Sequence, residues 1–383
     1  MEVTERGLKL QGPPAEAVEQ VLPRKQAFYT ASQWRLMWWK FRKHRLAMIA
    51  APVLALLYSM AILAQFLSPA LPDTRFTNYK QAPPVPIRVY EKGTGWHVPF
   101  IYDMVRETDP HTFKRVFVPD TSKKYPIALL VHGESYSFLG LVETDIHLIG
   151  ANGGPLFLLG TDRLGRDLFT RILYGSRLSL SIGLVGVTLT FTFGLLLGGL
   201  SGYLGGIVDT IIQRTIDLII CIPTIPLWLA LAAALPRNLT VVQTYLGIVV
   251  IMSAINWVSL ARVVRGKLLA LRGEDFCIAA QLVGASSMRI IWRHLIPSFA
   301  SYIIVALTLS IPGTILGETA LSFLGLGLRP PAVSWGVLLQ DCQNLEAIAH
   351  HPWQLYPVVW VVVTVLMFNF LGDGLRDAAD PYK

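Results

Sequence analysis

Six apolar runs, each long enough to cross a membrane, alternate with polar segments along the chain. They cover residues 46–67, 178–200, 207–235, 241–260, 300–321 and 353–371. An α-helix rises about 1.5 Å per residue, so about twenty apolar residues span the roughly 30 Å hydrocarbon core of a bilayer. The pattern therefore predicts an all-α polytopic membrane protein with six transmembrane helices.

The polar segment 262–299, between the fourth and fifth runs, has a helical pattern of its own. Apolar side chains recur at helical spacing, first at Phe276, Ala279, Ala280 and Val283 and then at Met288, Ile291, Trp292 and Leu295. Gly284 separates the two groups, Ser286 or Ser287 is a good N-cap for the second, and Pro297 is expected to end it. We predict two short amphipathic helices with a glycine corner. They either form a surface for another protein or pack on the chain's own helices.

The polar segment 68–177 is far longer than a simple connection between two helices. It holds 13 Lys and Arg against 11 Asp and Glu. Short runs of β-forming residues occur at 87–90, 115–118 and 127–131. We expect an extracytoplasmic α/β insertion after the first helix, and near its end a helix capped by Asp162 and reaching Gly175.

Composition and charge agree with a membrane protein. Of 383 residues, 53% are hydrophobic and only 15% are charged, and the formal net charge is +8. Five Lys and Arg lie between Arg35 and Arg45, and six lie in 262–299 against two acidic residues. Cytoplasmic segments of membrane proteins carry such an excess, whereas nothing here suggests nucleic-acid binding.

The charge pattern and the apolar runs together define a domain organisation. We expect a cytoplasmic tail and interfacial helix at 1–45, a first transmembrane helix at 46–67, and the insertion at 68–177. A five-helix core at 178–371, which includes the cytoplasmic loop 262–299, and a cytoplasmic tail at 372–383 would follow.

Small and ionisable residues inside the apolar runs indicate helix packing. Gly194, Gly198, Gly202 and Gly206 recur every four residues, a spacing that favours close approach of another helix. Pro223, Pro226 and Pro312 predict kinks. Glu318, near the end of the fifth run, is expected to form hydrogen bonds within the bundle.

No recognisable catalytic, phosphate-binding or metal-binding motif occurs in the sequence. There is no G-x-x-x-x-G-K-[ST] and no H-E-x-x-H, and the three cysteines lack the spacing of a zinc site. We therefore expect no catalytic residue, cofactor or metal ligand on this chain. If ATP and magnesium drive transport here, a partner binds them.

Several motifs resemble those of ABC importer permeases of the oligopeptide/dipeptide/nickel family, and in particular their second, C-type subunit. The ATPase-coupling motif of these permeases is matched by Ala279-Ala280, Gly284 and Ile296-Pro297, with Ile278 in place of the motif's glutamate. Further similarities are Gly160-Thr161-Asp162, Gly165-Arg166-Asp167, residues 321–327, Pro330-Pro331, Ser334-Trp335-Gly336, residues 372–377 and Asp380-Pro381.

The resemblance implies a type I importer permease fold and a place in a multi-subunit complex of the bacterial inner membrane. The implied partners are a homologous second permease, two ATP-binding subunits, an extracytoplasmic solute-binding protein and the bilayer lipids. The residues implied in ATPase coupling are Glu274, Phe276, Ala279, Ala280, Val283, Gly284 and Pro297. Candidates for a gate or a contact with the binding protein are Asp162, Arg166, Asp167, Glu318 and Trp335.

Two other classes of function stay open from the residues alone. A secondary transporter driven by an ion gradient would need coupling carboxylates at mid-depth and usually has internal repeats. A membrane-anchored enzyme would need a nucleophile and a base within 68–177, and no such set is visible there. The residues also leave the substrate open between a peptide, an oligosaccharide and nickel.

Overall fold

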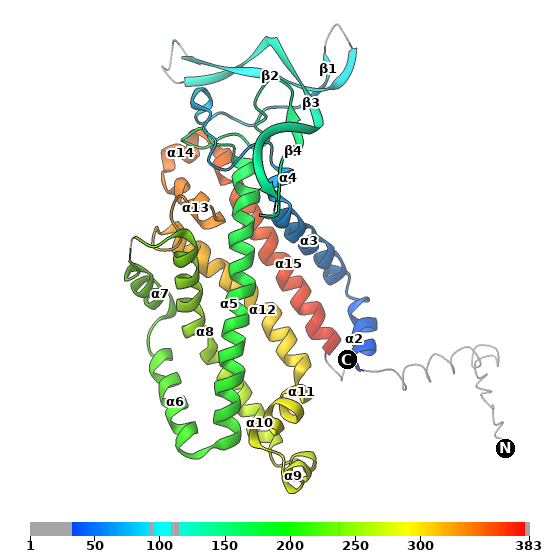
Figure 1. Ribbon diagram of the computed structural model, residues 1–383, viewed down its shortest axis with the longest axis vertical. Coiled ribbons are helices and arrows are strands. Elements are labelled where there is room, and N and C mark those ends of the chain that lie inside the picture. The colour runs from blue at the N-terminus through cyan, green and yellow to red at the C-terminus, as the bar shows by residue number, and fades with distance from the viewer. Residues whose placement is uncertain are drawn as a thin grey trace, which may run out of the picture.

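A bundle of long helices carries a β-sheet at one end and a pair of short helices at the other (Figure 1). The structure, a computed structural model, describes residues 33–91, 95–108, 110, 115–138, 140–236 and 238–379. The N-terminal part of the predicted tail, 1–32, and the motif Asp380-Pro381 lie outside the described residues.

The bundle contains the predicted membrane spans. Its helices are α3 (Arg45–Ile62), α5 (Leu168–Leu204), α6 (Gly206–Ile220), α7 (Thr224–Ala233), α8 (Val241–Leu271), α12 (Ala300–Phe323) and α15 (Tyr356–Ala379). Within the described residues, five helices are long and apolar enough to cross a membrane, or six if the bent pair α6 and α7 forms one span. The prediction of six spans therefore holds if α6 and α7 together form one span.

The third predicted span, 207–235, is broken rather than merely kinked. Helices α6 and α7 meet at an angle of 88°. Pro223 is the N-cap of α7, and because proline has no backbone N–H it cannot continue the hydrogen bonding of α6. The kink predicted at Pro223 and Pro226 is therefore a break between two helices.

Three predicted boundaries between membrane spans and polar segments also need correction. At each of them, a helix extends beyond the apolar run into the polar segment. Helix α5 begins at Leu168, so the boundary between 177 and 178 falls inside it. Helix α8 continues to Leu271, so the segment 262–299 begins as helix. Helix α15 continues to Ala379 and includes most of the predicted tail 372–383.

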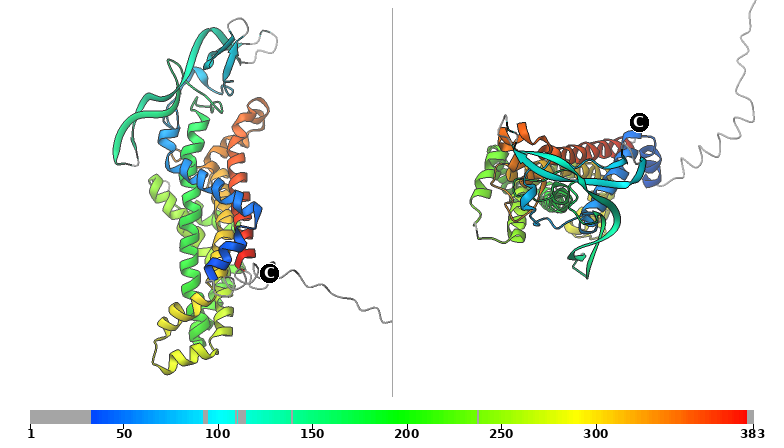
Figure 2. Two further views of the ribbon diagram at one scale, coloured as in Figure 1. Left: turned by 90° about the vertical axis from the view of Figure 1, so that its right-hand side faces the viewer. Right: turned by 90° about the horizontal axis from the view of Figure 1, so that it is seen from above.

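The insertion between α4 (Ala64–Leu67) and α5 is a four-stranded antiparallel sheet. Its strands are β1 (Arg88–Glu91), β2 (Gly95–Thr108), β3 (Arg115–Phe138) and β4 (Val142–Ala151), in the order β1-β2-β3-β4. The first half of β3 pairs with β2, as at Val118 with Val105, and its second half pairs with β4, as at Ile127 with Ala151. The curved strand β3 thus joins the two halves of the sheet (Figure 2).

The insertion is mainly a β-sheet, and the α-helical part of 68–177 within the described residues is the start of α5 at 168–177. The predicted runs 115–118 and 127–131 belong to the single strand β3. Between α4 and α5, the described residues form strands and one short 3₁₀ turn, Thr77–Tyr79, and no α-helix. A small core of Val85, Ile101, Leu156 and Phe157 supports the sheet.

The first described helix and the C-terminal end of the last described helix lie together on one flank of the bundle. Helix α2 (Gln33–Phe41) packs in a small apolar cluster with the ends of α3 and α15, formed by Met37 and Phe41 of α2, Ala47 of α3 and Ala378 of α15. Figure 1 shows α2 and the C-terminus next to each other on one flank. The main bundle core includes Leu268, Ile291, Ile315 and Phe368.

Short helices complete both ends of the bundle. At the end away from the sheet lie α9 (Asp275–Leu282), α10 (Ser287–Ile290), the π-helical turn η2 (Ile291–Leu295) and α11 (Ile296–Ser298). Towards the sheet lie α13 (Trp335–Gln340), η3 (Asp341–Gln343), α14 (Leu345–His350) and η4 (Pro352–Leu355).

Candidate coupling surface and buried polar clusters

Helix α9 presents an apolar surface at the tip of the molecule farthest from the sheet (Figure 1). Leu282 and Val283 are 84% and 89% exposed, and Phe276, Ile278 and Ala279 are also exposed. Exposed apolar side chains gathered at one tip are typical of a contact with another protein. We call Phe276, Ile278, Ala279, Leu282 and Val283 the tip surface.

The opposite side of α9 is anchored to the bundle. Cys277 is buried in the main core and Ala280 is packed against it. The Gln281 amide donates a hydrogen bond to the Tyr203 hydroxyl of α5 over 3.1 Å. Ala280 is therefore half-buried, whereas Phe276, Ala279 and Val283 from the same predicted face are exposed.

Sequence reasoning missed Ile278 and Leu282 as members of the tip surface. Almost every position of α9 is apolar or small, so helical spacing alone does not decide which face turns outward. Cys277 and Ala280 settle this by packing inward. The remaining predicted coupling residue of this helix, Glu274, is its exposed N-cap residue.

Gly284 forms the corner between α9 and α10. Its φ of +83° lies in the left-handed region that favours glycine. The backbone N–H of Gly284 donates to the carbonyl of Gln281 over 2.9 Å, and that of Ala285 donates to Ala280 over 3.0 Å, which closes the end of α9. Ser286 then caps α10 by accepting from the Arg289 backbone N–H over 3.4 Å.

Pro297 does not end the second short helix, contrary to the prediction. It lies inside α11, in the first turn of that helix, where a missing backbone N–H is tolerated. The π-helical turn η2 separates α10 from α11 and buries Ile291 and Leu295 in the core. Pro297 itself is exposed.

The glycine series connects this end of the bundle to α8. A Cβ atom at Gly198 would lie 2.6 Å from the carbonyl oxygen of Ala261, and one at Gly202 would lie 2.8 Å from that of Arg265. Gly194 faces Leu260 in the same way. Gly206 differs, because it is the first residue of α6 and has no heavy atom within 4 Å of its Cβ position.

An ion pair joins α6 to α8 near the same end. The guanidinium of Arg265 donates from both Nε and Nη2 to the carboxylate of Asp209, each over 2.6 Å. Such a two-pronged contact fixes orientation as well as distance. Direct contacts therefore link α9, α5, α6 and α8 at this end of the bundle.

Glu318 forms the centre of a buried polar cluster towards the sheet end. Its carboxylate accepts hydrogen bonds from the hydroxyls of Ser322 over 2.7 Å and Ser334 over 2.8 Å. The expected hydrogen bonding within the bundle is confirmed. Trp335 is also fully buried and donates its backbone N–H to Ser179 over 3.0 Å. Because both side chains are enclosed by their own chain, neither offers a surface to a binding protein.

A second buried cluster holds the segment 160–167. Asp162 accepts from the Arg166 side-chain Nε over 2.7 Å and from the backbone N–H groups of Leu164 and Arg166 over 2.8 and 2.9 Å. Arg171 also contacts this carboxylate through Nη1. Asp162 therefore organises the turn before α5 and does not cap a helix.

Asp167 is the residue that caps α5, a role predicted for Asp162. Its Oδ2 accepts from the Thr170 backbone N–H over 2.7 Å, while its Oδ1 is buried without a hydrogen-bond partner among the described residues. Burial raises the pKa of Asp167 to about 6, and the hydrogen bonds from Thr170 act in the opposite direction.

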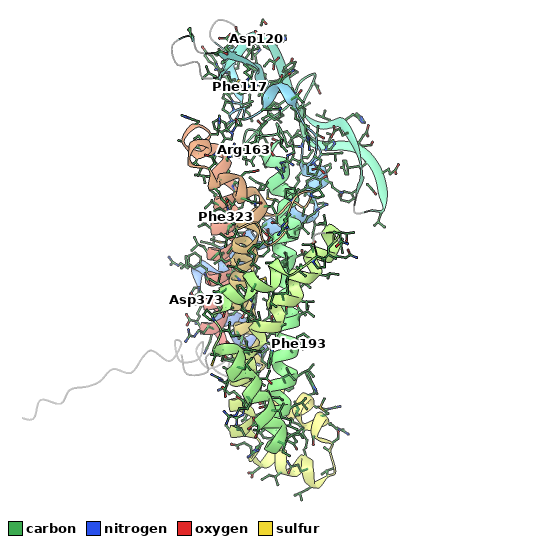
Figure 3. The ribbon with its side chains drawn as sticks, turned by 90° about the vertical axis from the view of Figure 1, so that its left-hand side faces the viewer. Phe117, Asp120, Arg163, Phe193, Phe323 and Asp373 are labelled. Carbon is green, nitrogen blue, oxygen red and sulfur yellow. The ribbon has the colours of Figure 1, made fainter. Side chains whose placement is uncertain are left out.

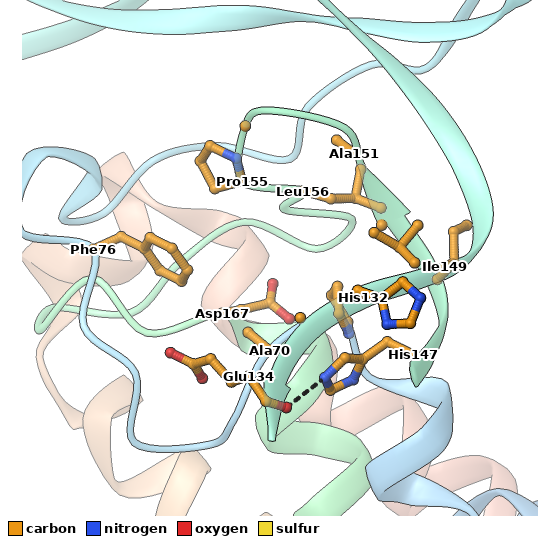
Figure 4. A pocket seen from close by; sticks show the side chains of 15 residues that line it. Ala70, Phe76, His132, Glu134, His147, Ile149, Ala151, Pro155, Leu156 and Asp167 are labelled. Atoms are coloured by element: carbon orange, nitrogen blue, oxygen red, sulfur yellow. Dashed lines mark hydrogen bonds between the residues drawn. The ribbon is translucent and has the colours of Figure 1, made fainter. Parts of the chain in front are cut away.

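Two cavities could accept a small molecule near these clusters. One of about 260 Å³ lies between the β3–β4 hairpin and the start of α5, and Figure 4 shows His147, Glu134 and Asp167 on its wall. His147 is held by the carbonyls of Ser68, at 2.6 Å, and Glu134, at 3.0 Å.

The other cavity, of about 330 Å³, lies in the helical bundle and includes Thr190, Asn256, Ser259 and Thr314 in its lining. Within the described residues, no group of three or more His, Cys, Asp or Glu side chains is arranged to hold a metal ion. Neither cavity is therefore assigned a metal.

Comparisons with known proteins agree with the motifs. Residues 194–382 match the family model "Binding-protein-dependent transport system inner membrane component", and residues 32–84 match "N-terminal TM domain of oligopeptide transport permease C". A chain of the inward-facing MetNI methionine ABC transporter aligns with 54% of this chain and 95% of its own length, with a TM-score of 0.43 and 19% identity.

Curated relatives are similar over more than half of the chain. The oligopeptide permease protein OppC of Bacillus subtilis is 37% identical over 223 residues, which are 58% of this chain and 70% of that protein. The dipeptide permease protein DppC of the same organism is 39% identical over 58% of this chain and 68% of its own length. OppC of Haemophilus influenzae is 39% identical over 58% and 69%, respectively.

These matches extend over both the first span and the helical core, and they confirm the resemblance drawn from the motifs. They also set aside the secondary transporter and the anchored enzyme, since the family consists of permease subunits. The chain belongs to the family of binding-protein-dependent ABC transport permeases, among the permeases of the oligopeptide and dipeptide type.

Proposed function

We propose that this chain forms half of the membrane pore of a peptide importer and that a partner ATPase moves it through the tip surface. The observation that carries the proposal is the exposure of Leu282 and Val283 on a helix whose other side is anchored in the core. ATP and magnesium would be bound by two ATP-binding partners, which agrees with the missing phosphate-binding motif of this chain.

The tip surface would fill an apolar groove on one ATPase. Small Ala279 lets the α9 backbone come close to a partner, and Leu282 and Val283 supply apolar area. The anchoring bonds of α9, through Gln281 and Tyr203, would carry the displacement to α5. The close glycine contacts would then pass it on to α8.

A homologous second permease would cover part of the bundle that is exposed in the single chain. Helices α6 and α7 expose Ile207, Ile211, Leu218 and Ile225. The lining of the bundle cavity carries no charged residue and combines apolar side chains with hydroxyl and amide groups, including Thr190 and Asn256. Such a lining suits a peptide backbone, and peptide transport is the function in the names of the relatives.

The proposed function also implies an orientation of the chain in the bacterial inner membrane. The tip surface and both chain termini would lie on the cytoplasmic side, in keeping with the basic residues of 35–45 and 262–299. The sheet would lie outside, where the solute-binding protein delivers its cargo. Its charges are nearly balanced, which suits a weak polar contact.

Leu282→Asp is the sharpest test of the tip surface. The added carboxylate would have to be desolvated in an apolar groove. We expect the ATPase to be lost when the permease is purified from membranes, and peptide uptake to fall at least tenfold at equal membrane levels. Leu129→Asp is the matched control, since Leu129 is 72% exposed on the sheet at the other end.

Two results would overturn the proposal. One is normal ATPase co-purification and uptake with Leu282→Asp. The other is an equal loss with Leu129→Asp, which would show that any exposed charge harms the protein.

A further inference from the structure

A cavity with an unusual concentration of arginine lies where the insertion meets the bundle. It has a volume of about 480 Å³ and its charged lining is Asp73, Arg75, Arg163, Arg166, Arg171 and Asp341. The walls come from the segment after α4, the turn before α5, the start of α5 and the end of α13. Figure 3 shows Arg163 between the sheet and the helices.

Two of these arginines are not engaged by the protein. Within the described residues, neither Arg75 nor Arg163 makes a hydrogen bond or an ion pair, and both are exposed to the cavity and solvent. Two unpaired guanidinium groups facing one cavity repel each other, and an anion between them would remove that repulsion.

Arg171 adds a donor that has no partner. Its side chain is only 2% exposed, yet its Nε finds no acceptor among the described residues. Its Nη1 and the Nε of Arg166 are both bound to Asp162. A buried N–H without an acceptor is costly, and Arg171 adds its positive charge to the wall of the cavity that it lines.

The charges of the lining indicate the class of anion. The lining contributes four guanidinium groups and the carboxylates of Asp73 and Asp341. The carboxylate of Asp162 pairs with two of these guanidinium groups. The net charge of the four arginines and three aspartates is therefore one positive charge. One surplus charge balances a singly charged anion, whereas a phosphate carries nearly two negative charges. Planar guanidinium groups also match the two oxygens of a carboxylate.

We propose that this cavity binds a carboxylate group, and that its natural ligand is the C-terminal carboxylate of a short peptide. The carboxylate class follows from the cavity alone. Only the identification with a transported peptide rests on the proposed function. The apolar neighbours Leu164, Pro330 and Val337 leave room for the rest of a small solute beside the arginines.

Binding to the complete transporter tests the proposal. The full chain with its co-purified partners would be placed in nanodiscs without any solute-binding protein. Triglycine, triglycine amide and inorganic phosphate would then be titrated by calorimetry. We expect triglycine to bind at least tenfold more tightly than its amide, about 1.4 kcal/mol, and more tightly than phosphate.

The double variant Arg75→Gln/Arg163→Gln should lower the affinity for triglycine at least tenfold. It removes no hydrogen bond or ion pair within the described residues, so the fold is expected to persist. Arg106→Gln is the matched control, because Arg106 is an exposed arginine on β2 outside the cavity.

Equal binding of triglycine and its amide, or of triglycine and phosphate, would overturn the carboxylate assignment. Unchanged affinity in the double variant, or no detectable binding, would do the same. Uptake assays separate this inference from the proposed function. Peptide uptake without carboxylate-dependent binding would refute only the proposal that the cavity binds a carboxylate. Carboxylate-dependent binding without peptide uptake would refute only the proposal that the chain belongs to a peptide importer.

Discussion

The carboxylate of Glu318 accepts a hydrogen bond from the hydroxyl of Ser334 over 2.8 Å, sixteen residues further along the chain. Ser334 is also the N-cap of α13, accepting from the Val337 backbone N–H over 3.2 Å. Glu318 therefore positions the start of α13 through its cap. Since Trp335 next to it donates to Ser179 of α5, one carboxylate organises three helices.

Replacement of Glu318 should weaken the fold at the sheet end of the bundle. Glu318→Ala leaves the buried hydroxyls of Ser322 and Ser334 without their acceptor, and each loss costs about 1–3 kcal/mol. We expect a clear fall in the midpoint of thermal unfolding in detergent. Glu318→Gln keeps one acceptor oxygen and should lose about half as much. Equal unfolding midpoints for Glu318→Ala and the wild type would contradict this role.

A methyl group at Gly198 should separate α5 from α8. The Cβ atom of Gly198→Ala would approach the backbone of Ala261 to within 2.6 Å, where neither helix can yield by turning a side chain. We expect a loss of roughly 1–3 kcal/mol, seen as a lower unfolding midpoint. Gly266→Ala on α8, where a Cβ meets nothing within 4 Å, is the control and should be neutral or stabilising. Similar effects of the two substitutions would argue against the contact.

Gly284 should be required for the position of the tip surface. At its φ of +83°, alanine is strained by about 1–2 kcal/mol, so Gly284→Ala should shift α9 and reduce peptide uptake at normal membrane levels. Gly284→Asn should keep more uptake, because asparagine tolerates this region better. Gly273→Ala, in open space before α9, is the matched control. Full uptake with Gly284→Ala would show that the corner tolerates another backbone conformation.

Asp167 should make stability depend on pH. Because its pKa in the folded protein is about 6, above the 3.8 of an ordinary aspartate, the folded state holds this proton more tightly than the unfolded state. Its contribution is fully present below about pH 4 and is lost as the pH rises through 6, by roughly 2–3 kcal/mol.

Asp167→Asn should remove that pH dependence. Asparagine still caps a helix but does not ionise. The variant should therefore unfold at a higher temperature than the wild type at pH 7.5, and the two should converge near pH 4. Asp73→Asn, at an exposed carboxylate, is the control. Parallel pH profiles for Asp167→Asn and the wild type would refute the assignment.

The ends of α5 and β3 show where local patterns were insufficient. The turns 168–177 look too polar for a membrane helix, yet Arg171 pairs with Asp162 and Arg177 donates from Nε to the Ala61 carbonyl over 2.7 Å. These partners lie 9 and 116 residues away in the sequence, so a count of charges within the run does not reveal them. The runs 115–118 and 127–131 likewise merge into β3, because two different strands pair with its two halves.

The sequence by itself determined the class of protein, the number and order of the apolar spans, and the place of the glycine corner. Hydrophobic length and backbone freedom are local properties, so they can be read directly from the residues. Only the tertiary structure decided which face of α9 turns outward, which aspartate caps α5, and which arginines share a cavity. The outward face of α9 and the arginine cavity depend on contacts between residues far apart in the chain, and the free energy of burial that selects among them exists only once the helices have packed. The cap of α5 is a local contact between Asp167 and Thr170, and the structure was needed to choose between two nearby aspartates.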